Sequence, residues 1–204
     1  DDAHVALPAA RALERLYSVS GRERELCEML LLQAQLEENV DTKRVLYKRL
    51  GELRETALGD KSGAISAWRE AANLDSFDDS ALASLDRLYT ETGAHDALVG
   101  VLSEREKAAA DGAKRRELLI RKAAVQSEKL NLIDDAIATL STVVDDFGQE
   151  KTLAETLSAL YQRAEKWPDL VDSLEAELAL ADKVEERVAL LFRIGEIRRS
   201  RLEE

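Results

Sequence analysis

Few residues of the kinds that carry out nucleophilic, acid–base or metal chemistry occur in this sequence. The 204 residues include two histidines, His4 and His95, and one cysteine, Cys27. The histidines are far apart, and neither has a second histidine or a cysteine at the spacing of a zinc site. Cys27 lies in the apolar stretch 26–32, which predicts a core thiol rather than a nucleophile. We therefore predict no catalytic, metal-binding or cofactor-binding residue, and a protein that is not an enzyme.

Paired carboxylates could act as acid–base dyads or calcium ligands, but their positions favour a structural role. The pairs are Glu37–Glu38, Asp78–Asp79, Asp134–Asp135, Asp145–Asp146 and Glu185–Glu186. Most are expected at helix ends, where those at N-termini complement the helix dipole, and none has calcium-loop spacing. The net charge of −12 argues against binding to nucleic acid or to an anionic membrane.

Arginine is the charged residue that recurs at fixed places in this acidic chain. Arg49, Arg121 and Arg193 are each separated by 72 residues, and chance would give roughly 0.05 such columns. Similar positions elsewhere in the repeat add three further arginines. The full candidate set is Arg15, Arg49, Arg87, Arg121, Arg163 and Arg193.

Two interpretations of these arginines remain open. The planar, five-donor guanidinium suits carboxylates, so a ladder of arginines could bind an acidic peptide or a partner protein. Alternatively, each arginine covers apolar surface with its stem and pairs with a glutamate three residues further on, such as Glu52 or Glu196.

The elements that position these residues follow from a repeat of 72 residues. Ala-Leu-Glu-Arg-Leu-Tyr at 12–17 aligns with Ser-Leu-Asp-Arg-Leu-Tyr at 84–89, and Tyr17, Tyr89 and Tyr161 coincide. Chance would give roughly 0.25 triple leucine matches. Six are found, at 13/85/157, 16/88/160, 26/98/170, 30/102/174, 46/118/190 and 58/130/202. The tyrosines share a helical stripe with Leu13 and Leu16 and are expected to pack in the core with the hydroxyl at its edge.

Within each repeat the apolar residues have helical spacing, as in Leu46, Leu50, Leu53 and Ala57. Capping residues and glycines separate about eleven helices. Their expected ranges are 8–19, 22–38, 42–58, 61–75, 79–92, 94–110, 113–130, 133–146, 151–165, one opened by Pro168, and 184–203. The predicted units are 1–75, 76–147 and an incomplete 148–204, together forming one array over 1–204.

The segment from Leu50-Gly51 to Leu58-Gly59-Asp60, followed by Ala64, Trp68 and Ala71, resembles a tetratricopeptide (TPR) repeat. In that family Gly51 and Ala64 would be the small residues that let paired helices approach, and Trp68 the aromatic that packs against the next hairpin. The degenerate segment around Trp167 and Pro168 is similar to bacterial repeats of this kind. The resemblance implies an all-α fold, a right-handed superhelix of antiparallel helices, and a concave groove that holds a peptide or a partner helix.

These observations predict a protein-binding scaffold or adaptor that uses its concave groove and needs no cofactor. The alternative is a structural spacer or a self-associating segment of a larger protein. The helix at 184–203 favours self-association, because its face of Val188, Leu191, Ile194 and Ile197 lacks a following helix to cover it. No apolar run is long enough to span a bilayer. The single thiol favours the cytoplasm, with bacterial periplasm as the alternative.

Overall fold

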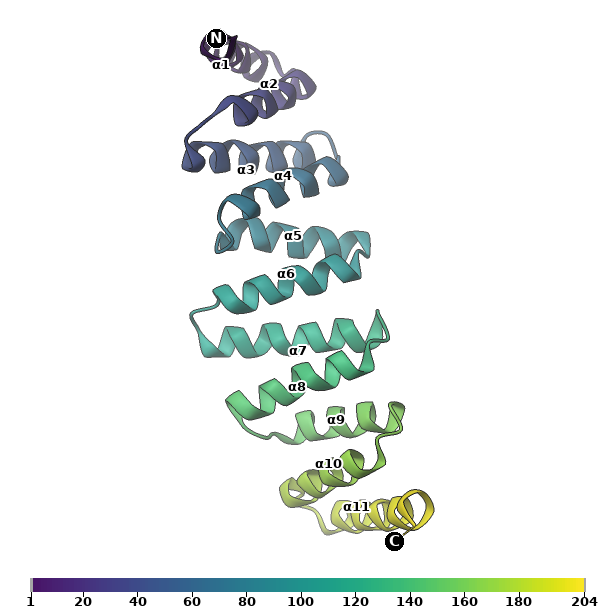
Figure 1. Cartoon of the computed structure of the whole chain (residues 1–204). Helices are drawn as coiled ribbons and strands as arrows, with labels where there is room; N and C mark the ends of the chain where they lie inside the picture. Colours follow the sequence, from purple (N-terminus) through teal and green to yellow (C-terminus); the bar gives the residue numbers. More distant parts are fainter. Residues whose placement is uncertain (1, 204) are drawn as a thin grey trace. The chain divides into compact units, whose positions relative to one another are not determined.

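The computed structural model describes the backbone of residues 2–203 and the side chains of residues 5–203. Over this range the chain forms eleven α-helices and no strand, with a short π-helical turn at its end (Figure 1). The helices are α1 (Asp2–Ser20), α2 (Glu23–Leu36), α3 (Val40–Thr56), α4 (Lys61–Leu74), α5 (Asp79–Thr92), α6 (His95–Ala108), α7 (Gly112–Glu128), α8 (Ile133–Phe147), α9 (Lys151–Arg163), α10 (Trp167–Leu180), α11 (Val184–Ile197) and the turn Arg198–Leu202. The predicted number and order of helices are confirmed.

The helices belong to two compact units, residues 1–108 and 109–204. Inside each unit, every helix packs against the helix before it and the helix after it in the sequence, and neighbours run antiparallel (Figure 1). This confirms the predicted all-α array, in which antiparallel helices pack in the order of the sequence. The predicted boundaries at 75/76 and 147/148 lie in the connections α4–α5 and α8–α9, and the three-unit division stays a prediction.

The 72-residue period is also present in the backbone conformation. Apart from Gly148, every positive-φ residue in the described range belongs to one of two columns spaced by 72. The columns are Gly21, Gly93 and Glu165, with φ of 64°, 70° and 55°, and Gly59, Asn131 and Glu203, with φ of 63°, 54° and 56°. Each column marks the end of a helix, where a left-handed residue turns the chain into the next connection. The first and third copies of the repeat therefore share their turn geometry although their residues differ.

Side-chain caps explain where several helices begin. Asn39 accepts a hydrogen bond from the backbone N–H of Thr42 at 2.9 Å, and Asp111, its counterpart 72 residues later, accepts one from Lys114 at 3.2 Å. Asp60 caps α4 in the same way through Gly63, at 2.9 Å. These bonds satisfy N–H groups that have no partner inside the helix.

The leucine columns 26/98/170 and 30/102/174 are buried in all three copies, whereas the column 58/130/202 is half-buried throughout and the stripe on the N-terminal helix differs from its copies. Leu85 and Leu88 on α5 are buried, as are their counterparts on α9, whereas Leu13 and Leu16 on α1 are 37% and 59% exposed. The expectation that this stripe is buried in all three copies is therefore wrong for α1. Helices α5 and α9 lie between two packed neighbours, but among the described residues α1 packs extensively only against α2.

One helix boundary, at the start of α1, and one helix face, on α11, also differ from the prediction. Helix α1 begins at Asp2 rather than near residue 8, so Pro8 lies inside it. On α11, Ile194 and Ile197 are buried together with Leu190 against α10, so the predicted uncovered face was wrong for these two isoleucines. The exposed apolar side chains of α11 are instead Val184, Val188, Leu191 and Phe192. No helix of the described chain is long and apolar enough to cross a membrane.

Candidate partner-binding surface

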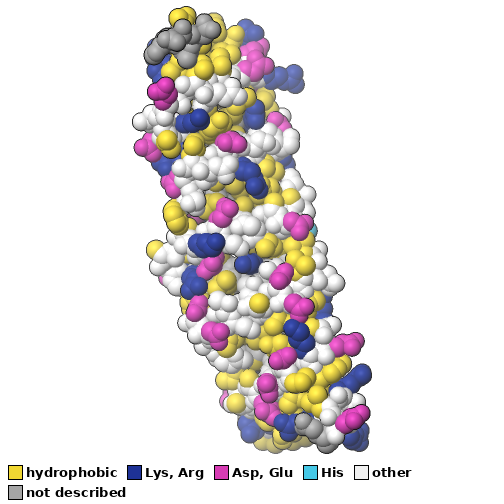
Figure 2. All heavy atoms as spheres, in the orientation of Figure 1, with side chains coloured by type: hydrophobic (Ala, Val, Ile, Leu, Met, Phe, Trp, Pro, Cys, Tyr) yellow, Lys and Arg dark blue, Asp and Glu magenta, His cyan; other side chains and the backbone are white. Residues whose placement is uncertain are grey.

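The six candidate arginines lie on the odd-numbered helices, one on each. Arg15 is on α1, Arg49 on α3, Arg87 on α5, Arg121 on α7, Arg163 on α9 and Arg193 on α11. The 72-residue repeat places Arg15 and Arg87 at one equivalent position and Arg49, Arg121 and Arg193 at another. Arg163 lies four residues after Ala159, the third member of the first column. Basic side chains are interspersed with acidic ones over the face visible in Figure 2, without a large patch of one sign.

In the first unit the arginines join successive odd-numbered helices. Arg49 of α3 forms an ion pair with Glu14 of α1. Arg87 of α5 donates to Glu55 of α3 at 2.8 Å and to Glu91 of its own helix at 3.2 Å. The hydrogen bond to Glu55 raises the pKa of Arg87, although burial works against it. Both arginine side chains are about half exposed, and their partner carboxylates lie deeper, at 15% for Glu14 and 21% for Glu55.

The second unit repeats this arrangement with neutral partners. Arg163 of α9 donates to the backbone carbonyl of Ser127 at 3.2 Å and to Oδ1 of Asn131 at 3.1 Å, at the end of α7. Arg193 of α11 donates to Oε1 of Gln162 on α9 at 2.6 Å. Arg121 is half-buried on α7, and Arg15 is exposed on α1.

The glutamates expected as partners three residues further on were the wrong ones. Arg49 pairs with Glu14, which is 35 residues earlier, rather than with Glu52. Glu196 accepts from Arg199 at 2.5 Å, while Arg193 bonds Gln162. The distance between odd-numbered helices is short enough for a long arginine to span, so a partner on the next hairpin competes with one on the same helix.

The remaining residues considered for chemistry fall in structural places. The side chain of His4 lies outside the described residues, and His95 is the first residue of α6 with a buried, unpartnered Nδ1. Cys27 is buried, and burial raises the pKa of its thiol, as expected for a core residue. Among the described residues no three His, Cys, Asp or Glu side chains gather where they could hold a metal ion.

The acidic pairs also lie where helix ends or ion pairs explain most of them. Asp78 caps α5, and the pairs 134–135 and 185–186 occupy the first turns of α8 and α11. Asp146 pairs with Arg115 at 3.0 Å, and Glu37 pairs with Arg11 at the same distance. Asp145 is different: it lies in the last turn of α8 and borders a pocket that sequence analysis did not predict.

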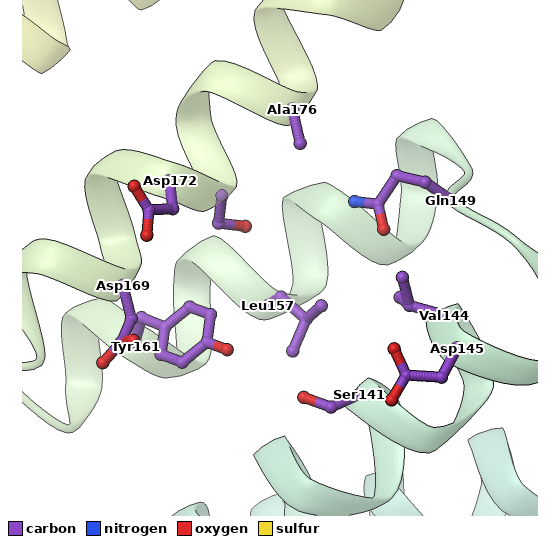
Figure 3. A pocket seen from close by; sticks show the side chains of 10 residues that line it. Ser141, Val144, Asp145, Gln149, Leu157, Tyr161, Asp169, Asp172 and Ala176 are labelled. Atoms are coloured by element: carbon purple, nitrogen blue, oxygen red, sulfur yellow. The ribbon is translucent and has the colours of Figure 1, made fainter.

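That pocket has a volume of about 260 Å³ and lies where α8, α9 and α10 meet (Figure 3). Its lining residues are Ser141, Val144, Asp145, Gln149, Leu157, Tyr161, Asp169, Asp172, Ser173 and Ala176. The sequence contains no motif that predicts this pocket, because its lining residues come from three helices and one connection. The 72-residue repeat relates these residues to equivalent positions earlier in the chain but does not show that they surround a cavity.

No family model matches the chain, and no curated protein matches it in sequence. Among solved structures it is similar to YrrB, described as a TPR protein with an unusual peptide-binding site, at 12% identity and a TM-score of 0.45, over 78% of this chain and 88% of YrrB. It is similar to PilF of Pseudomonas aeruginosa at 14% identity and a TM-score of 0.43, over 98% and 88% of the two chains. For MamA the identity is 14% and the TM-score 0.45, over 86% and 96%. Similarity at this level says nothing about which surface of this chain binds a partner.

Proposed function

We propose that this chain is a non-catalytic scaffold that binds acidic segments of a partner protein along the odd-numbered helices of each unit. The observation that carries the proposal is the presence of an arginine on every odd-numbered helix, with those of α3 and α5 half exposed above more deeply buried carboxylates. A guanidinium has five N–H donors, and a single carboxylate partner uses at most two of them.

The buried partners explain how such a surface could recognise a ligand. Glu14 and Glu55 each accept from an arginine of the next odd-numbered helix and so hold its guanidinium in one place. A pre-positioned side chain loses less conformational entropy on binding than a free one. The outward N–H groups can then donate to carboxylates or carbonyl oxygens of an extended segment, with no cofactor involved.

Site-specific photo-crosslinking in cells that make the protein tests this proposal. A photo-crosslinking residue replaces Arg49 or Arg193 on odd-numbered helices, or Ser66 or Glu70, exposed on α4, as matched controls. We expect one and the same polypeptide to be captured from the odd-numbered positions and not from α4. Capture from α4 alone, or of unrelated proteins at each position, would contradict the proposal.

Variants in which both members of an arginine–glutamate pair are replaced by glutamine separate a loss of ligand binding from a loss of stability. The double variants Arg49→Gln/Glu14→Gln and Arg87→Gln/Glu55→Gln leave no unpaired charge at either site. We expect them to keep their helix content and to lose the crosslinked partner. Unchanged capture by both variants would assign these arginines to structure alone.

A second candidate function is self-association, which the exposed apolar face of α11 favours. Val184, Val188, Leu191 and Phe192 are each more than half exposed. Burying such a face against a second copy would be favourable. Sedimentation at increasing concentration, with Phe192→Glu as the comparison, tests this: a mass that rises only in the unaltered chain supports it, and a constant monomer mass contradicts it.

A further inference from the structure

The lining of the pocket between α8, α9 and α10 contains three aspartates and one aromatic residue, Tyr161 (Figure 3). Asp169 and Asp172 of α10 stand on one side, and Asp145 of α8 stands on the other. Leu157 and Tyr161 of α9 lie between them, with the tyrosine hydroxyl directed toward the pocket. No lysine or arginine is among the lining residues.

A second pocket, in the first unit, is the repeat counterpart of this one. It has a volume of about 200 Å³ and lies between α4, α5 and α6. Each of its lining residues is found 72 positions before a lining residue of the acidic pocket. The corresponding positions are 69/141, 72/144, 73/145, 85/157, 97/169, 100/172, 101/173 and 104/176. The cavity is therefore part of the repeat and not an accident of one connection.

In the first-unit pocket the chain supplies its own guanidinium. Nε and Nη2 of Arg69 lie 3.0 and 2.5 Å from the hydroxyl of Tyr89, and the guanidinium lies 5.6 Å from the centre of the tyrosine ring. Tyr89 corresponds to Tyr161 of the acidic pocket, whereas Arg69 corresponds to Ser141. The second unit thus has the equivalent tyrosine but no arginine at the position that contacts it.

The two pockets also differ in the formal charge of their lining residues. The first pocket carries one arginine and one glutamate, Glu104, whose formal charges cancel. In the acidic pocket Asn73, Ala97 and Gly100 are replaced by Asp145, Asp169 and Asp172, and Glu104 by Ala176, which leaves three carboxylates and no cation.

The fold accounts for only one of these three carboxylates. Asp145 lies in the last turn of α8, where the helix dipole disfavours a negative charge. None of the three forms an ion pair with a lysine or arginine of the described chain, and the nearby Lys166 pairs with Asp134 at 2.7 Å instead. Asp169 alone lies in a first turn, where the dipole favours it.

We propose that the acidic pocket binds an arginine side chain of a partner polypeptide, in the place that Arg69 occupies in the first unit. The guanidinium lies against the ring and hydroxyl of Tyr161 and donates charge-assisted hydrogen bonds to the aspartate carboxylates. The smaller Ser141 leaves the space for it, and the stem of the ligand packs on Leu157. This site is separate from the arginine-bearing surface proposed above and binds the opposite charge.

Titration of the full chain with the peptide acetyl-Gly-Ser-Arg-Ser-Gly-amide, followed by ¹H–¹⁵N NMR, tests the site. We expect shifts centred on residues 141–149, 157–161 and 169–176 and a Kd on the order of millimolar, as suits a single side chain. The peptide with citrulline in place of arginine is the neutral control and should bind at least about tenfold more weakly. A third peptide has lysine in place of arginine. If the citrulline peptide or the lysine peptide binds as tightly as the arginine peptide, the assignment to a guanidinium is overturned.

Substitutions that remove a carboxylate and a substitution that fills the pocket both test where the peptide binds. Asp145→Asn and Asp172→Asn should each weaken binding about two- to fivefold. Ser141→Arg should abolish it by restoring the internal guanidinium, while Thr142→Ala, at an exposed residue of α8 outside the pocket lining, should leave it unchanged. Unaltered binding by Ser141→Arg, in a variant whose helix content is intact, would overturn the proposal.

A transplant into the first unit provides a gain of binding that misfolding cannot imitate. The variant Arg69→Ser/Asn73→Asp/Ala97→Asp/Gly100→Asp/Glu104→Ala gives that pocket the same three carboxylates, and a Cβ at Gly100 meets open space. New shifts around Tyr89 on adding the arginine peptide are expected, and their absence in the folded variant would contradict the proposal. Loss of Arg49 or Arg193 should not change this binding, so the two proposals fail or succeed separately.

Discussion

Gly51 lies so close to the indole of Trp68 that a Cβ on residue 51 would be 2.8 Å from both Cε2 and Nε1 of the ring. Gly51 belongs to α3 and Trp68 to α4, and these two helices pack extensively against each other. The absence of a side chain at residue 51 is therefore what lets the aromatic ring pack between the helices of this hairpin.

Gly51→Ala should destabilise the protein. Alanine gains about 1 kcal/mol over glycine in a helix, but a methyl group inside contact distance of a buried ring costs roughly 1–3 kcal/mol. We expect a net loss of up to about 2 kcal/mol in urea unfolding. Gly195→Ala on α11 is the matched control, because nothing lies within contact of its added Cβ, and it should be neutral or stabilising. Stabilisation by both substitutions would show that Trp68 moves aside without cost.

Asp78 should make the free energy of unfolding depend on pH in the acidic range. Burial alone would raise its pKa, but hydrogen bonds from Ser80, Lys48 and the backbone N–H of Ala81 lower it to about 2. Because the folded-state pKa lies below that of the unfolded chain, the stabilisation is present above the ordinary aspartate range and is lost as pH falls toward 2. The shift corresponds to about 2 kcal/mol.

The variant Asp78→Asn isolates this effect, since asparagine can still cap α5. The unaltered chain should exceed the variant in unfolding free energy near pH 6, and the difference should shrink toward zero near pH 2. A difference that stays constant over this range would assign the stabilisation to capping rather than to charge.

Two arginine pairs should differ sharply in what they contribute to stability. Asp86 is only 4% exposed and its partner Arg105 14%, so Arg105→Leu removes a buried charge-assisted hydrogen bond and should cost about 1.5–3 kcal/mol. Arg49 is 46% exposed, and its partner Glu14 also accepts from Gln33 at 2.8 Å, so Arg49→Leu should cost less than about 1 kcal/mol. Thermal or urea unfolding of both variants checks this; similar losses would contradict it.

Cys27 should be unreactive in the folded chain. Its side chain is buried on α2, and the raised pKa keeps the thiol protonated at neutral pH. We expect a thiol reagent such as DTNB to react slowly in buffer and rapidly in urea. Rapid reaction in buffer would show that α2 opens readily or that Cys27 is accessible.

The sequence by itself determined the helices, their order and the repeat. Helical spacing and capping residues act within three or four positions, so the predicted starts of α3, α4 and α5 at residues 42, 61 and 79 lie close to the observed starts at 40, 61 and 79. The same local reasoning assigned Cys27 to the core. It also identified the arginine column, because a repeat is visible without any knowledge of contacts.

Only the tertiary structure decided what these residues touch. Arg49 bonds Glu14 rather than Glu52, and Arg69 lies on Tyr89, because side chains from different hairpins meet at distances set by helix packing and not by sequence spacing. Burial on α1 and α11 likewise depends on which neighbours are present, so identical leucine patterns give exposed Leu16 and buried Leu88. The acidic pocket could not be predicted for the same reason: its charge becomes meaningful only once α8, α9 and α10 bring Asp145, Tyr161 and Asp172 around one cavity.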